Sequence, residues 1–126
     1  MAKRILVVTP TSLVRNWEAE FEKWLKDRVR VLALAESSRE KVVKFIKRFV
    51  TGRQHEVLIL SYETFRIHQA HFAAPGACDL LICDEAHRLK NDATQTAMAL
   101  NKLVCTRRVL LSGTPMQNDL EGKTRI

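Results

Sequence analysis

Residues 79–87 read Asp79-Leu80-Leu81-Ile82-Cys83-Asp84-Glu85-Ala86-His87, an apolar run that ends in two adjacent acids. Four consecutive apolar residues between polar ones predict a short strand that is buried on both faces, as in the middle of a parallel sheet. Asp84 and Glu85 would then stand at the carboxyl end of that strand, which is where open α/β sheets bind their ligands.

Two neighbouring carboxylates repel each other, so they need a compensating charge, and a divalent cation with a phosphate supplies it. In a nucleotide hydrolase, Asp84 would hold Mg²⁺ through water, and Glu85 would orient or deprotonate the attacking water. A strand that ends in a solvated acidic turn gives the same pattern. The acidic stretch alone fits both interpretations.

The rest of the chain alternates apolar runs with amphipathic stretches, and we expect strands at 5–8, 29–34, 57–60, 80–83 and 107–111. Strands that alternate with helices predict an α/β fold, a parallel sheet with helices on both faces. Leu13, Trp17, Phe21, Trp24 and Leu25 form one helical stripe, so we expect both tryptophans in the core. Either Thr11 or Ser12 is expected to cap that helix, Ser37 to cap the next, and Ser61 a third.

Composition sets broad limits. A chain of 126 residues, 46% hydrophobic and 28% charged, is sufficient for one soluble domain. No apolar run is long enough for a transmembrane helix, so no membrane partner is expected. Three cysteines without metal-ligand spacing predict reduced thiols.

The positive charge of the chain is concentrated in its first half. The net charge is +6 in residues 1–52 and +1 in residues 53–126. This excess suits a polyanionic partner, but it also suits an ordinary solvated helix face.

Four stretches together are more specific than any one of them. Residues 7–13 (VVTPTSL), 60–65 (LSYETF), 84–91 (DEAHRLKN) and 111–120 (LSGTPMQNDL) resemble, in sequence and in order, the helicase motifs of the SWI/SNF family of DNA-dependent ATPases in helicase superfamily two. Within that family the chain looks most like the recombination-repair DNA translocases. The resemblance extends over residues 4–120.

The resemblance implies a partial N-terminal RecA-like helicase lobe of the P-loop NTPase type over residues 1–120, followed by an unrelated tail at 121–126. It implies ATP and Mg²⁺ as cofactors and double-stranded DNA as the partner, with a recombinase filament or chromatin as further partners. It also implies action in recombinational repair in the nucleus.

The matching motifs assign three groups of site residues by resemblance. His87 joins Asp84 and Glu85 in the catalytic group, as a coupler that hydrogen-bonds toward the later Ser-Gly-Thr stretch. That coupling stretch is Ser112, Gly113 and Thr114, with Gln117 added on the match alone. The DNA-backbone contacts would be Thr9, Thr11, Ser12, Ser61, Tyr62, Thr64, Arg88, Lys90 and Asn91.

The sequence lacks a convincing phosphate-binding loop. Its single Gly-Lys-Thr, at residues 122–124, has Gln117 where the loop requires glycine. We therefore expect a fragment of an ATP-dependent DNA translocase that is not a competent ATPase alone, so whether the chain is itself an enzyme stays open. Two alternatives also stay open: a truncated, non-enzymatic product that binds DNA or a partner, and a fragment of a DEAH-type RNA helicase.

Overall fold

The computed structural model describes residues 4–35, 38–52, 55–73, 77–86, 95–105 and 107–111. Within these residues one sheet contains the strands β1 (Ile5–Thr9), β2 (Val31–Ala33), β3 (Val57–Ser61), β4 (Leu80–Cys83) and β5 (Arg107–Leu110). The strand order is β2-β3-β1-β4-β5, and every neighbouring pair is parallel. The predicted α/β class with a parallel sheet is confirmed.

Strand β1 lies in the centre of the sheet and pairs with β3 on one side and β4 on the other. Leu6, Val7 and Val8 are fully buried, so side chains on both faces of this strand are covered. A strand buried on both faces needs helices on both sides of the sheet. Its unbroken apolar sequence is therefore the direct cause of the layered architecture.

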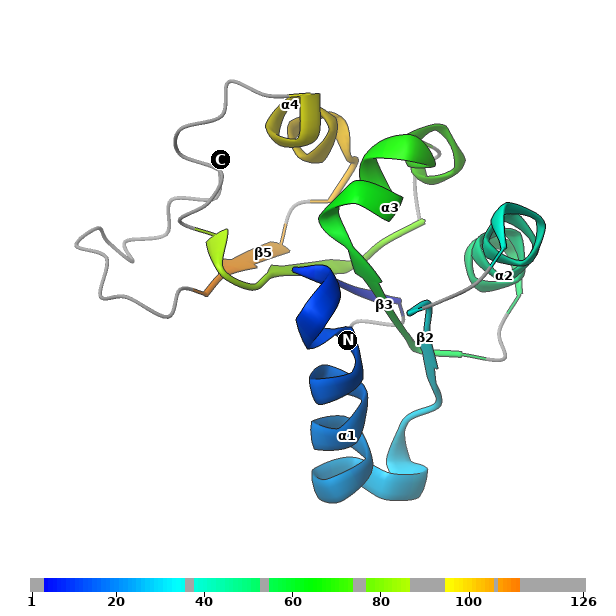
Figure 1. Ribbon diagram of the computed structural model, residues 1–126, viewed down its shortest axis with the longest axis vertical. Helices are drawn as coiled ribbons and strands as arrows, with labels where there is room; N and C mark the ends of the chain where they lie inside the picture. The colour runs from blue at the N-terminus through cyan, green and yellow to red at the C-terminus, as the bar shows by residue number, and fades with distance from the viewer. Residues whose placement is uncertain are drawn as a thin grey trace.

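The helices divide unequally between the two faces (Figure 1). Helix α1 (Val14–Leu25) covers one face, and α2 (Arg39–Thr51), α3 (Tyr62–Ile67) and α4 (Gln95–Lys102) cover the other. Alternate residues of the strands follow this division. Val7 and Ile59 pack on the α1 side, whereas Leu6 and Leu58 pack on the side of the three other helices.

The helix starts differ from two of the sequence predictions. Helix α2 is capped by Ser38, whose hydroxyl accepts a hydrogen bond from the Lys41 N–H at 3.3 Å, so the predicted cap at Ser37 was one residue too early. Thr11 and Ser12 lie in a 3₁₀ turn (Thr11–Leu13) that leads into α1, and no side chain caps either segment. The predicted cap at Thr11 or Ser12 was therefore wrong.

The two tryptophans of α1 have different environments. Trp17 is half-buried and packs with Phe21, their ring centroids 6.0 Å apart, against the sheet. Trp24 is 68% exposed, so the prediction that both tryptophans belong to the core was wrong for this residue. Trp24 Nε1 donates to Glu20, and the Lys23 ammonium lies over its ring, so polar neighbours hold it on the surface.

Strands β2 and β5 form the two edges of the sheet as far as the structure describes it. At the β5 edge Val109 and Leu111 remain exposed. No helix among the described residues is long and apolar enough to span a bilayer.

Candidate functional site

The carboxyl ends of three adjacent strands bring predicted site residues together. Thr9 ends β1, Ser61 ends β3, and Asp84 directly follows β4. Thr9 and Ser61 are register partners in the parallel pairing of β1 with β3. Parallel strands end at the same edge of a sheet, so residues far apart in sequence meet there.

Asp84 is the centre of this group. Its Oδ2 accepts a hydrogen bond from the Thr9 hydroxyl at 3.1 Å and a second from Trp17 Nε1 at 2.8 Å. Its main-chain N–H donates to the Val8 carbonyl at 2.9 Å, and its own carbonyl accepts from the Tyr62 hydroxyl at 2.6 Å. The carboxylate and the backbone of this residue are therefore both fixed.

Glu85 follows in a tight turn and is one of two described non-glycine residues with positive φ, at 58°. This left-handed conformation costs a side-chain-bearing residue roughly 1–2 kcal/mol. Two backbone hydrogen bonds with Leu111, the residue after β5, hold the turn: Leu111 N–H donates to the Cys83 carbonyl at 2.8 Å, and Ala86 N–H donates to the Leu111 carbonyl at 2.7 Å. Strain that the surroundings enforce in this way often marks a functional turn.

The predicted DNA contacts after β1 and β3 differ in exposure. Thr11 and Ser12 are exposed in the turn before α1, whereas Thr9 is fully buried and faces Asp84. Ser61 is buried and caps α3 as predicted: its hydroxyl accepts from the Thr64 N–H at 3.1 Å and donates to the Thr64 hydroxyl at 2.9 Å. Thr11 and Ser12 are thus the most accessible of this set.

The remaining predicted site residues lie outside the part of the chain that the structure describes. They are His87, Arg88, Lys90 and Asn91 after the acids, and Ser112, Gly113, Thr114 and Gln117 after β5. Their assigned roles stay predictions, as does the division of the chain at residue 120.

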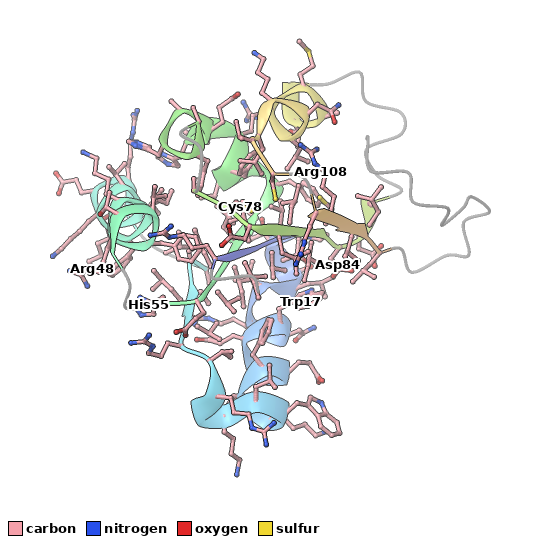
Figure 2. All side chains as sticks on the ribbon, turned by 180° about the vertical axis from the view of Figure 1, so that it is seen from behind. Trp17, Arg48, His55, Cys78, Asp84 and Arg108 are labelled. Carbon is pink, nitrogen blue, oxygen red and sulfur yellow. The ribbon has the colours of Figure 1, made fainter. Side chains whose placement is uncertain are left out.

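Trp17 is a site residue that the sequence analysis missed. Its indole N–H needs a hydrogen-bond partner when the ring is buried, and this requirement could have indicated from the sequence that Trp17 bonds to a polar group. The sequence could not show that the partner would be an acid 67 residues away. In Figure 2 Trp17 and Asp84 lie at the junction between α1 and the sheet.

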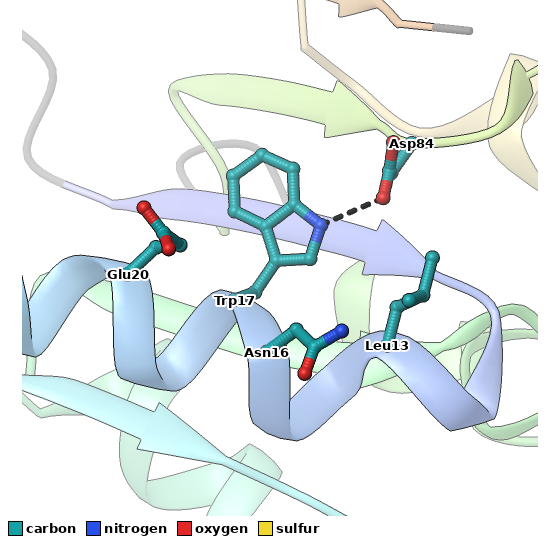
Figure 3. Close-up of a pocket in the computed structure, with 5 residues that line it drawn as sticks. All are labelled: Leu13, Asn16, Trp17, Glu20 and Asp84. Carbon is teal, nitrogen blue, oxygen red and sulfur yellow. Dashed lines mark hydrogen bonds between the residues drawn. The ribbon is translucent and has the colours of Figure 1, made fainter. Parts of the chain in front are cut away.

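A pocket of about 330 Å³ lies against this hydrogen bond. It is lined by Leu13, Asn16, Trp17 and Glu20 from the start of α1 and its preceding turn, and by Asp84 from the sheet, as Figure 3 shows. The volume is at the lower end of the range for small-molecule sites. The pocket therefore gives solvent a path to the α1 side of the acid.

The oxygen donors at the strand ends suit Mg²⁺ better than a softer metal. Mg²⁺ prefers oxygen ligands and keeps several waters, so one or two carboxylates plus substrate phosphates are enough to hold it. The described residues contain no cluster of three or more His, Cys, Asp or Glu side chains that could hold a metal alone. Cys83 does not compete, because burial raises the pKa of its thiol to about 12 and keeps it neutral.

The chain matches the SNF2-related domain over residues 1–124, nearly its whole length. The chain belongs to the SNF2 family. The sequence and order of the four motifs, read with the acid pair at the end of β4, had predicted this membership, and the match confirms it.

Among curated relatives, the chain is 64% identical over 122 residues to the DNA repair and recombination protein RAD54 of Oryza sativa subsp. japonica, covering 96% of the chain and 12% of the relative. It is 61% identical to the protein CHROMATIN REMODELING 25 of Arabidopsis thaliana, covering 96% and 13%. The human RAD54-like protein is 46% identical, covering 93% and 16%. The predicted similarity to the recombination-repair branch is thus confirmed, and the chain spans about an eighth to a sixth of these relatives' length.

A solved structure shows the same fold. The SWI2/SNF2 ATPase core of Sulfolobus solfataricus in complex with double-stranded DNA matches with a TM-score of 0.70 and 24% identity. The match covers 90% of this chain and 22% of that one. This similarity confirms that the described sheet and helices form a RecA-like lobe of the SNF2 type.

Proposed function

We propose that the chain forms part of the first ATPase lobe of an ATP-dependent double-stranded-DNA translocase that acts in recombinational repair. The observation that carries the proposal is the position of Asp84 and Glu85 at the carboxyl end of a central parallel strand, with Asp84 Oδ2 fixed by Thr9 and Trp17. Membership of the SNF2 family and the similarity to RAD54 proteins support the substrate class.

In this proposal the two acids have separate tasks. Asp84 holds Mg²⁺ through water, and its preset carboxylate lowers the reorganisation that binding requires. Glu85, held in the strained turn that follows β4, would orient or deprotonate the attacking water. Bound Mg²⁺ with ATP would supply charge neutralisation at the phosphates and the group to be transferred.

Double-stranded DNA is the proposed polymer. Its backbone would lie across the exposed Thr11 and Ser12, near Tyr62 and Thr64, and reach Arg88, Lys90 and Asn91. The similar archaeal core was solved with double-stranded DNA, which supports a duplex rather than the RNA that a DEAH-type helicase would bind. A recombinase filament or chromatin would be the further partner, and the nucleus the place of action.

The acids are tested in a chimera in which residues 1–120 replace the aligned stretch of the full-length rice relative. Glu85→Gln keeps the shape of the side chain and removes the base, so DNA-stimulated ATP hydrolysis should fall by about 100-fold or more. Glu22→Gln on the exposed surface of α1 is the matched control and should leave turnover unchanged. Full activity of the Glu85→Gln chimera would contradict the proposed role.

The 126-residue chain by itself should show no DNA-stimulated ATP hydrolysis. The sequence has no complete phosphate-binding loop, and an arginine finger of the kind that a second lobe supplies changes turnover by about 10³ to 10⁵. Turnover that disappears on Glu85→Gln in this chain would show that it is competent alone.

Binding separates the remaining alternatives. Salt-sensitive binding to duplex DNA that weakens on Thr11→Ala or Lys90→Ala would support the DNA track. The same binding with no turnover even in the chimera would favour a non-enzymatic product. Tighter binding to RNA than to duplex DNA would favour the RNA helicase alternative.

A further inference from the structure

Asp84 receives side-chain hydrogen bonds from three different elements of the fold. Thr9 at the end of β1 and Trp17 on α1 donate to its carboxylate, and Tyr62 on α3 donates to its main-chain carbonyl. The two helices lie on opposite faces of the sheet, so Asp84 is held from both faces. The carboxylate and the main chain of this one residue are thus bonded to β1, α1 and α3.

The donors fix a particular orientation of the carboxylate. Both hydrogen bonds that the described side chains donate to this group end on Oδ2. Two bonds on one oxygen fix the rotation of the carboxylate, and the position of Oδ1 is then fixed as well. The Tyr62 bond to the carbonyl, at 2.6 Å, restrains the backbone of the same residue.

The indole of Trp17 is itself rigidly placed. Its ring packs against Phe21 and belongs to the apolar cluster that Val7, Val14 and Ile59 form under the sheet. An indole N–H can only donate a hydrogen bond, so Trp17 is always the donor and Asp84 always the acceptor. A displacement of α1 would therefore displace the donor directly, because the ring cannot rotate freely to follow the acid.

Both helices that carry these donors begin at segments predicted to meet DNA. The turn over Thr11–Leu13 leads directly into α1, so Trp17 is about one and a half helical turns beyond Thr11 and Ser12. Tyr62 is the first residue of α3, directly after Ser61. A ligand that moves either segment must move a donor to Asp84.

We propose that Trp17 and Tyr62 are positioning residues that connect the DNA-contacting segments after β1 and β3 to Asp84, so that duplex DNA binding sets the orientation of the metal-binding carboxylate. This inference rests on the proposed function. It assigns to α1 and α3 a path from the DNA to the acid that is separate from the predicted coupling residues after β5.

The first test observes the Trp17 N–H without any turnover. In the full 126-residue chain, Trp24→Phe leaves Trp17 as the single indole, whose ¹⁵N–¹H signal then reports on one hydrogen bond. We expect Asp84→Asn to shift this signal and to speed its exchange with solvent deuterium. We also expect a short DNA duplex to shift the signal when added alone. The proposal would be overturned if the chemical shift of this signal did not change in Asp84→Asn, or did not change when duplex DNA is added.

The second test uses the chimera defined above and separates positioning from simple stability. Trp17→Phe keeps a ring in the cluster and removes the N–H, and Tyr62→Phe removes the hydroxyl. Loss of a group that orients a metal ligand typically weakens metal affinity about 10- to 100-fold. We expect each variant to raise the Mg²⁺ concentration for half-maximal ATP hydrolysis about tenfold and to reduce stimulation by DNA. Trp17 is not among the predicted DNA contacts, so Trp17→Phe should in addition leave the affinity for duplex DNA nearly unchanged.

Trp24→Phe is the matched control, because it removes an exposed tryptophan from the same helix. Its Mg²⁺ dependence should equal that of the parent chimera. If Glu85→Gln abolishes turnover but Trp17→Phe and Tyr62→Phe keep the parental Mg²⁺ dependence and DNA stimulation, the positioning role is wrong and the proposed function stands. If Glu85→Gln leaves turnover intact, the proposed function itself fails.

Discussion

The hydroxyl of Thr9, which is fully buried, donates a 3.1 Å hydrogen bond to the carboxylate of Asp84, 75 residues later in the chain. This bond joins the ends of two neighbouring strands, β1 and β4, at the edge where the proposed nucleotide site lies. The same hydrogen bond therefore links two neighbouring strands and orients the carboxylate of Asp84.

Replacing Thr9 with valine should lower the free energy of unfolding by about 1.5–3 kcal/mol. The change keeps the size of the side chain and removes one hydrogen bond to a charged acceptor, and the net contribution of such bonds is of this order. Urea unfolding followed by circular dichroism measures it. Thr11→Val at an exposed position is the control and should change the value by no more than about 0.5 kcal/mol. Equal stability of the two variants would show that the Thr9 bond contributes nothing.

Two histidines should make the fold less stable in mild acid. Burial lowers the pKa of His55 below its usual 6.5, and the charges of Arg30 and Arg48 lower it further, against an opposing effect of Glu56. Burial first, and then His71 and Arg39, also lower the pKa of His68. Figure 2 labels His55 and Arg48 near the amino-terminal side of the sheet.

The direction follows from proton binding. A histidine with a lowered folded-state pKa takes up its proton more readily in the unfolded chain, so its stabilising contribution is complete above about pH 7 and declines as the pH falls through 6.5 and below. Thermal unfolding between about pH 7.5 and about pH 5.5 should therefore show a falling midpoint. His55→Gln with His68→Gln should reduce this fall, and an identical fall in the double variant would refute the assignment to these groups.

The three cysteines should be unreactive in the folded chain. All are free and buried, and the sulfurs of Cys78 and Cys105 are 3.5 Å apart. Burial, with Cys105 beside it, raises the pKa of Cys78 well above its usual range, and burial raises the pKa of Cys83 to about 12. The thiolate is the reactive form, so iodoacetamide near neutral pH should add no mass before unfolding and three groups after it. Labelling of the native chain would contradict the burial of these thiols.

The strands and the position of the acid pair could be predicted because an unbroken apolar run, a local property of the sequence, determines them. An apolar run such as residues 57–60 has only one stable place in an α/β protein, between two covering layers, and all four of its residues are buried. The position of Asp84 follows, since a residue that ends a central strand must lie at the edge of the sheet. The Ser61 cap was predictable for a similar reason, because it depends on a partner only three residues away.

The predictions that failed depend on contacts that local sequence does not contain. Trp24 continues the apolar stripe of α1, but it is exposed and contacts Glu20 and Lys23. Thr11 is a residue type that is favoured at helix N-caps, yet the backbone after Pro10 forms a 3₁₀ turn and the Thr11 side chain makes no cap. The donor role of Trp17 depends on how α1 packs against the sheet, and no local residue pattern predicts that tertiary relationship.

Asp84 is proposed to stand at the metal of a bound nucleotide. The most direct test is a crystal structure of the chimera with a non-hydrolysable ATP analogue and Mn²⁺, whose anomalous scattering locates the metal independently of the protein. We expect a metal peak within one bound water of the Asp84 carboxylate, with Thr9 and Trp17 still donating to Oδ2. A metal and nucleotide bound away from this carboxylate, with Asp84 contacting only bulk solvent, would contradict it.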